Sequence, residues 1–104
     1  MLIFSNRNEL RLSGLLGLCV RARQCTFGEK ACLQGMRSGE IRLLLMDETI
    51  SDSAGEKYEA LGARESIPVC RLPDGFLWTA TGKDGMVMGI RSESFAEQVL
   101  SCLE

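Results

Sequence analysis

The residues best suited to chemistry in this sequence are basic side chains gathered around one glycine. Gly28 separates a short apolar segment from a helical pattern over residues 29–37, so a helix is expected to begin beside it, with Lys30 in its first turn. The basic residues nearby in sequence are Arg21, Arg23 and Arg42. A helix N-terminus presents unpaired N–H groups and a partial positive charge, which favour phosphate. The pattern indicates an anion site, without the glycine motifs of nucleotide-hydrolysing or dinucleotide-binding folds.

A second candidate is the acidic pair Asp47 and Glu48, which follows the apolar run 43–46. α/β folds often place their sites at strand ends, and paired carboxylates bind metals or transfer protons. Nothing else completes such a site, and the chain has no histidine. An acidic loop before the next helix is therefore the favoured interpretation. We expect no catalytic residue, no metal site and no cofactor.

Two apolar features near the C-terminus have alternative interpretations. The segment from Gly85 through Met86 and Val87 to Gly89 is mostly a buried strand, but its first residues can face a ligand, and exposed apolar groups pack on unstacked bases. Trp78 is the only tryptophan. We expect it to pack in the core beneath a short helix, and the alternative is an exposed ring that stacks on a base.

Composition limits the class of protein. The net charge is −2, but residues 7–42 hold seven basic and three acidic residues, whereas residues 43–104 hold five basic and eleven acidic residues. This asymmetry indicates an anionic partner for the first half, and the alternative is that the charges lie on solvated helix faces without a partner. The five cysteines form no C-x-x-C pair, so we expect buried thiols rather than a zinc site. No apolar run is long enough to span a membrane, and the first ten residues do not resemble a signal peptide, so a cytoplasmic protein is expected.

Helical and strand patterns alternate along the chain. Strands are expected at 25–27, 43–46, 67–70 and 86–90. Helices are expected from a cap at Asn6 or Asn8 to about residues 22–24, at 29–37, from a cap at Ser53 through at least Leu61, at 76–81, and from a cap at Ser92 through Leu103. The continuous apolar run 43–46 is typical of a strand covered on both faces. Ser53 and Glu56 have the spacing of a capping box for the third helix. The expected fold class is α/β, a single domain over residues 1–104 with helices on both faces of a mixed sheet of about four strands.

Several of these motifs occur in the order known from one protein family. The segment LLGLCVRARQCTFGEKACLQGMRSGEIRLLLM is followed by Asp47-Glu48-Thr49, Ile67-Pro68-Val69, Gly82-Lys83 and Val87-Met88-Gly89-Ile90. This succession resembles the ribosomal proteins that bind kink-turn RNA, and especially their small bacterial YlxQ-like branch. The resemblance covers about residues 10–103. It implies a three-layer α/β/α sandwich that recognises sharply bent RNA.

The resemblance also implies positions for RNA contacts. Many members carry G-x-N-E-x-x-K at the second helix, and here Gly28 is retained, while Lys30, Ala31 and Gln34 stand at the asparagine, glutamate and lysine positions. Lys30, Arg37, Arg42 and the backbone of Gly28 and Glu29 would contact phosphates. Base contacts would come from Gln34, Glu48 and the loop of Gly85, Met86 and Val87.

The leading hypothesis is therefore a non-catalytic protein that binds ribosomal or other structured RNA. The alternative is a protein-interaction module that has kept the fold and lost specific RNA recognition, which the acidic balance and the changed motif positions favour. A small α/β enzyme is the least favoured interpretation.

Overall fold

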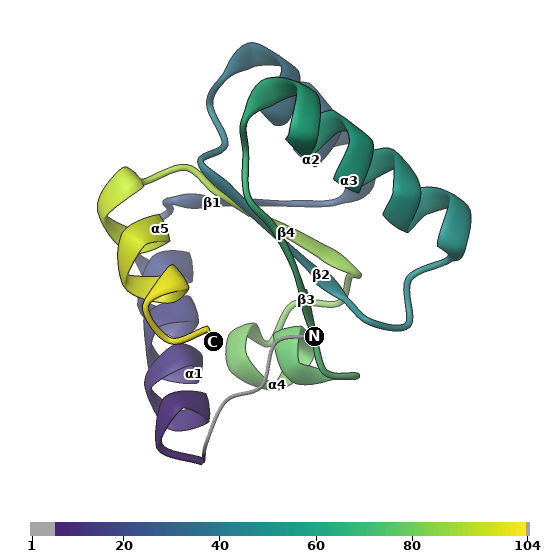
Figure 1. The fold of residues 1–104 in the computed structure, drawn as a ribbon. Helices are drawn as coiled ribbons and strands as arrows, with labels where there is room; N and C mark the ends of the chain where they lie inside the picture. Colours follow the sequence, from purple (N-terminus) through teal and green to yellow (C-terminus); the bar gives the residue numbers. More distant parts are fainter. Residues whose placement is uncertain (1–5, 104) are drawn as a thin grey trace.

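The computed structural model describes residues 6–103, in which five helices cover both faces of a four-stranded mixed sheet (Figure 1). The elements in chain order are α1 (Asn6–Arg21), β1 (Cys25–Phe27), α2 (Glu29–Ser38), β2 (Leu43–Asp47), α3 (Asp52–Glu65), β3 (Val69–Leu72), α4 (Phe76–Thr81), β4 (Val87–Ile90) and α5 (Glu93–Leu100). The strand order is β1-β4-β2-β3. β4 runs antiparallel to both β1 and β2, and β3 runs parallel to β2. The expected α/β fold class is confirmed.

The central strand β2 explains why the molecule has two hydrophobic cores. All five of its residues are buried, and successive side chains of a strand point to opposite faces. Leu43 and Leu45 pack with α1, α4 and α5, whereas Leu44 and Met46 pack with α2 and α3. Figure 1 shows the same division, with α2 and α3 on one side of the sheet and the other three helices opposite. The unbroken apolar run thus contributes side chains to the cores on both faces of the sheet, as predicted.

Close approach of α2 to the sheet depends on two glycines that face one side chain. Ile41 is fully buried, and a Cβ added at Gly35 of α2 would lie 2.7 Å from its Cδ1 atom. A Cβ added at Gly89 of β4 would lie 2.5 Å from the same atom. These distances are shorter than any van der Waals contact between carbons, so the two glycines let Ile41 fill the space between helix and sheet.

Three expectations about local structure were wrong. The N-cap of α3 is Ser51, whose side-chain oxygen accepts a hydrogen bond from the Ala54 N–H at 3.3 Å, and Ser53 already lies inside the helix. The strand expected from residue 67 begins at Val69, because Pro68 has no N–H to donate to the ladder. Trp78 is 57% exposed, since Leu77 is the α4 residue that turns into the core.

We predict that Gly89→Ala lowers the free energy of unfolding by about 1–3 kcal/mol, because the new methyl group collides with Ile41 in a packed core. Adding Ile41→Val removes the Cδ1 atom at the shortest distance, so the double variant should recover part of that loss. Chemical denaturation measures both changes.

The matched control is Gly14→Ala on the exposed side of α1, where nothing lies within 4 Å of an added Cβ. This variant should be slightly more stable than the parent, because alanine favours helix. Equal effects of the substitutions at Gly14 and Gly89 would contradict the packing argument.

Candidate nucleic-acid interface

The N-terminus of α2 is left open by its sequence. Gly28 is the N-cap residue with φ +95°, a conformation that L side chains rarely adopt, and it has no side chain with which to cap the helix. The Cys32 N–H donates to the Gly28 carbonyl at 2.9 Å, which closes the first helical turn. By contrast, Ser51 and Ser92 cap α3 and α5 with their hydroxyl oxygens. The first N–H groups of α2 thus have no side-chain cap and remain suited to an external acceptor.

Sheet topology brings a second helix N-terminus to the same place. β1 and β2 both run antiparallel to β4, so they are parallel to each other, and α2 and α3 start beyond the same ends of these strands. The partial positive charges of the two helix N-termini therefore converge. β4 runs in the opposite direction, so its first residues meet them there.

Three distant segments enclose a hollow of about 430 Å³ at this end of the sheet. Its lining residues are Gly28, Glu29, Thr49, Ile50, Ser51, Gly85, Met86 and Val87. The hollow thus unites five of the residues that the sequence analysis assigned to RNA contacts, from two segments nearly sixty positions apart. Met86 is 47% exposed, whereas Val87 is buried at 1%, so of these two side chains only that of Met86 reaches the surface.

Asp47 connects the segments around this hollow by hydrogen bonds. It is 4% exposed and is the only charged residue that is buried among residues 8–103. Its Oδ1 accepts hydrogen bonds from the Thr49 N–H at 2.8 Å and the Thr49 hydroxyl at 2.6 Å, and its Oδ2 accepts one from the Gly75 N–H at 2.9 Å. Its own N–H donates to the Met86 carbonyl at 2.8 Å. One residue therefore connects the end of β2, the start of α4 and the loop before β4.

The ionisation of Asp47 follows from these contacts. Burial alone would raise its pKa, but the three hydrogen bonds donated by Thr49 and Gly75 stabilise the carboxylate and hold the pKa below its usual value of 3.8. With its acceptor sites used in this way, Asp47 acts as a structural anion. Within the described part of the chain, no group of three or more histidine, cysteine, aspartate or glutamate side chains is placed to hold a metal ion.

The other predicted contact residues lie at increasing distance from the hollow. Lys30, Gln34 and Arg37 are exposed and follow one face of α2 at helical spacing. By helix rise, Arg37 lies about 10 Å along the axis from Lys30. Arg42 is at the opposite end of the sheet, where its N–H donates to the Ile90 carbonyl at 2.7 Å. Glu48 points to another surface, because its Oε1 accepts a hydrogen bond from the Asp74 N–H at 3.2 Å.

The sequence analysis did not assign Thr49, Ile50 and Ser51 to the site, although they line the hollow. Their position directly after a buried strand and before a helix was the available signal, because such loops gather at the ends of parallel strands. Thr49 also contacts the opposite wall, with its hydroxyl 3.6 Å from the Met86 sulfur atom.

Comparison with known proteins identifies the fold. No protein-family model and no curated protein sequence matches the chain. A solved structure of a protein of unknown function from Bacillus halodurans matches with a TM-score of 0.85 and 24% identity, over 88% of this chain and 95% of that one. The Giardia lamblia 15.5kD RNA binding protein matches with a TM-score of 0.73 and 15% identity, over 95% of this chain and 88% of that one. The chain therefore has the fold of an RNA-binding protein.

The described helices are also too short or too polar to cross a lipid bilayer.

We predict that Asp47→Asn lowers the free energy of unfolding at neutral pH by about 2 kcal/mol, because an amide offers one acceptor where the carboxylate offers two. The folded-state pKa lies below the usual value, so this stabilisation is present above pH 3.8 and is lost as the pH falls through the lowered pKa. Denaturation at neutral and strongly acidic pH should show the stability difference between parent and variant shrinking in acid.

Asp84→Asn provides the control, because Asp84 is an exposed loop residue. It should leave stability within about 0.5 kcal/mol of the parent at both pH values. A stability difference between parent and Asp47→Asn that stays constant from neutral to acidic pH would show that the carboxylate charge is not what matters.

Proposed function

We propose that this chain is a non-catalytic cytoplasmic RNA-binding protein that recognises structured, sharply bent RNA of the kink-turn type, ribosomal or otherwise. The observation that carries the proposal is the hollow in which the open N-terminus of α2, the N-terminus of α3 and the loop before β4 meet. Two converging positive helix ends attract a phosphate backbone, and an exposed methionine beside them offers an apolar surface to an unstacked base.

Each residue of the interface has a distinct role in this proposal. The N–H groups at Gly28 and Glu29 and the ammonium group of Lys30 bind phosphate oxygens near the hollow. Gln34 lies one turn further along the exposed face of α2, where its amide is able to read a base edge. Arg37 extends the same face for RNA that continues along the helix.

Two of the expected contact residues contribute little or nothing to the proposed interface. Arg42 is able to reach only RNA that continues to the far end of the sheet. Glu48 is left out, because its carboxylate accepts a hydrogen bond from the Asp74 N–H.

Exposed apolar residues favour the alternative function as a protein-interaction module. Leu10 is 78% exposed, Trp78 57% and Leu18 48%, and all three belong to the helical layer opposite α2 and α3. Association with a protein partner through this layer would resist salt, because burial of apolar surface does not depend on ionic strength as phosphate contacts do.

The proposal is tested by titrating the protein with a kink-turn RNA and with an unbent duplex, each at low and high salt. We predict preferential binding of the bent RNA. Lys30→Ala should weaken that binding by about threefold to tenfold and reduce the slope of log K against log salt by about one, as expected for one lost phosphate contact.

Arg64→Ala is the matched control, because Arg64 lies in the last turn of α3, away from the hollow, and pairs with Glu65. It should bind the bent RNA as the parent does. Equal weak binding of both RNAs that disappears at high salt would overturn specific recognition. No binding of either RNA would favour the protein-interaction alternative.

A further inference from the structure

Three arginines meet at the end of the sheet opposite the hollow. β4 ends at Ile90, which pairs with Cys25 at the start of β1 on one side and with Leu43 at the start of β2 on the other. The chain segments that flank these strand ends are therefore neighbours, and each of them carries an exposed arginine. These residues, here called the arginine cluster, are Arg23, Arg42 and Arg91.

Backbone contacts hold the arginine cluster together. The Arg42 N–H donates to the Ile90 carbonyl at 2.7 Å, and the Arg91 N–H donates to the Gln24 carbonyl at 2.9 Å. The Arg91 guanidinium group also donates to the Arg23 carbonyl. Continuing the register of β2 and β4 by one residue places Arg42 opposite Arg91. Like charges at opposite positions of antiparallel strands repel each other, so this arrangement is unfavourable without an anionic partner.

No described carboxylate neutralises the arginine cluster. The ion pairs within residues 6–103 lie on α3 or between α3 and β3. Glu40 and Glu93 are close to Arg42 and Arg91 in sequence, but both are exposed and neither forms an ion pair within that range. This end of the sheet thus carries three uncompensated positive charges on a protein whose net charge is −2.

Arg23 occupies a backbone position that favours glycine. Its φ is +57°, its N–H donates to the Val20 carbonyl at 3.0 Å, and the Gln24 N–H donates to the Cys19 carbonyl at 3.0 Å. These two bonds form the Schellman motif, in which the residue at this position is usually glycine because other residues are strained there. Strain at an exposed arginine indicates a function for its side chain.

Two further arginines at this end have a structural explanation. Arg21 and Arg37 lie in the last turns of α1 and α2, where a positive side chain complements the negative end of the helix dipole. They raise the positive potential around the arginine cluster. Arg42 and Arg91 belong to no helix, so the helix dipole does not account for them.

We propose that the arginine cluster binds the phosphate backbone of double-stranded RNA, independently of its sequence. A planar guanidinium group matches two phosphate oxygens at once. Side chains at opposite positions of neighbouring strands begin about 5 Å apart, so Arg42 and Arg91 are able to contact neighbouring phosphates. A protein partner is disfavoured, because the exposed large apolar residues lie on other segments and a protein interface needs an apolar centre.

The inference rests on the proposed function in that the ligand is RNA, and it adds a second site. The five residues of β2 separate the hollow from the arginine cluster by about 15 Å, so one phosphate cannot contact both. The exposed face of α2 connects the two ends, with Lys30 near the hollow and Arg37 near the cluster. A bent RNA held at the hollow would thus place a duplex arm on the arginine cluster.

The experiment uses an unbent RNA duplex, because it has no kink for the hollow to recognise. Titration of the isotope-labelled full chain at low salt is followed by NMR. The backbone signals of Arg23, Arg42 and Arg91 should shift more than those of Gly28 and Met86. Fluorescence titration with the same duplex at two salt concentrations gives the affinity and its salt dependence.

Arg23→Gly separates the binding role of this residue from its structural role. Glycine adopts a positive φ without strain, so the variant should be at least as stable as the parent. It should nevertheless bind the duplex about threefold to tenfold more weakly, and the slope of log K against log salt should fall by about one.

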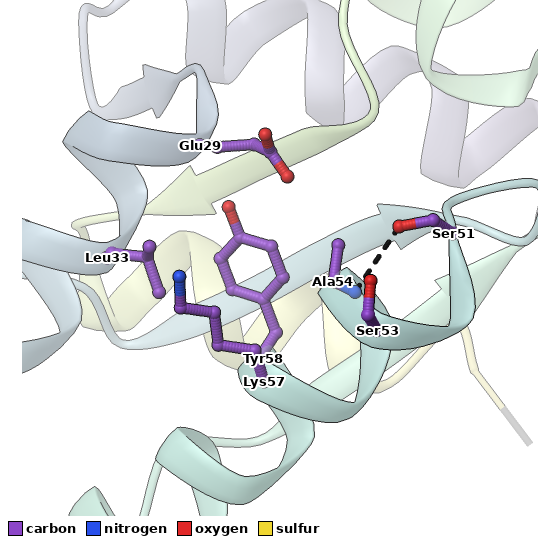
Figure 2. A pocket seen from close by; sticks show the side chains of 7 residues that line it. All are labelled: Glu29, Leu33, Ser51, Ser53, Ala54, Lys57 and Tyr58. Carbon is purple, nitrogen blue, oxygen red and sulfur yellow. Dashed lines mark hydrogen bonds between the residues drawn. The ribbon is translucent and has the colours of Figure 1, made fainter.

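Arg42→Glu places a carboxylate opposite Arg91, so it should preserve stability while it weakens duplex binding by more than about tenfold. Lys57→Glu is the matched control, because it makes the same change of charge on an exposed residue of α3. Figure 2 shows Lys57 beside Tyr58, in the groove between α2 and α3. This control should weaken duplex binding by less than about threefold.

Three results would overturn the proposal. One is a duplex titration that shifts no signal of the arginine cluster, and another is an Arg23→Gly variant that binds the duplex as the parent does. The third is an equal loss of affinity in Arg42→Glu and Lys57→Glu, which would mean that only net charge matters. Kink-turn recognition fails separately, if the bent RNA binds no more tightly than the duplex, and that result leaves duplex binding at the arginine cluster intact.

Discussion

The hydrogen bonds of the buried Asp47 carboxylate are the interactions on which the geometry of the hollow depends. A charge at 4% exposure is tolerated only when its acceptor sites are filled, and three donors from Thr49 and Gly75 fill them. The same residue binds the loop before β4 through its backbone N–H, and its carbonyl accepts from the Ile50 N–H at 3.1 Å. The hydrogen bonds of Asp47 therefore fix the positions of α4 and of both loops beside β2.

The second constraint is the closeness of α2 to the sheet. Ile41 occupies the volume that side chains at Gly35 and Gly89 would need, so α2 packs closely against β4 around this side chain. This contact sets the place of the helix, and the conformation of Gly28 sets where the helix begins. The open N-terminus of α2 thus results from packing at one end of the helix and backbone conformation at the other.

The fold was predictable because its main signals are local. The unbroken run from Leu43 to Met46 identified a strand with two covered faces, and alternation of helical and strand patterns identified the layers. The sequence was less informative where two neighbouring residues were equally suited to the same structural role. Ser51 and Ser53 are both reasonable caps, and only the backbone angles of Ser51 decide between them. The six-residue helix α4 is too short for a period to show that Leu77 turns inward and Trp78 outward.

The site was predictable only in part, because it is assembled from tertiary contacts. Gly28 and Met86 were identified separately, but their meeting at one hollow follows from the strand order β1-β4-β2. Arg42 is close to the basic residues of α2 in sequence and distant from the hollow in space. The buried hydroxyl of Tyr58 has no hydrogen-bond partner within the described residues, which was not predictable because the spacing of Ala54, Tyr58 and Leu61 indicates only an apolar helix face.

The separation of the two cores has a consequence for how many molecules the protein can hold at once. The residues that line the hollow lie at the starts of α2 and α3, at the start of β4 or in the loops beside them, whereas the exposed Leu10, Leu18 and Trp78 belong to the helical layer on the other side of the sheet. Occupants of the two sides would not compete for surface. The proposed RNA site and the exposed apolar surface therefore lie on opposite faces of a sheet only four strands wide, so an occupant of one face leaves the other face free.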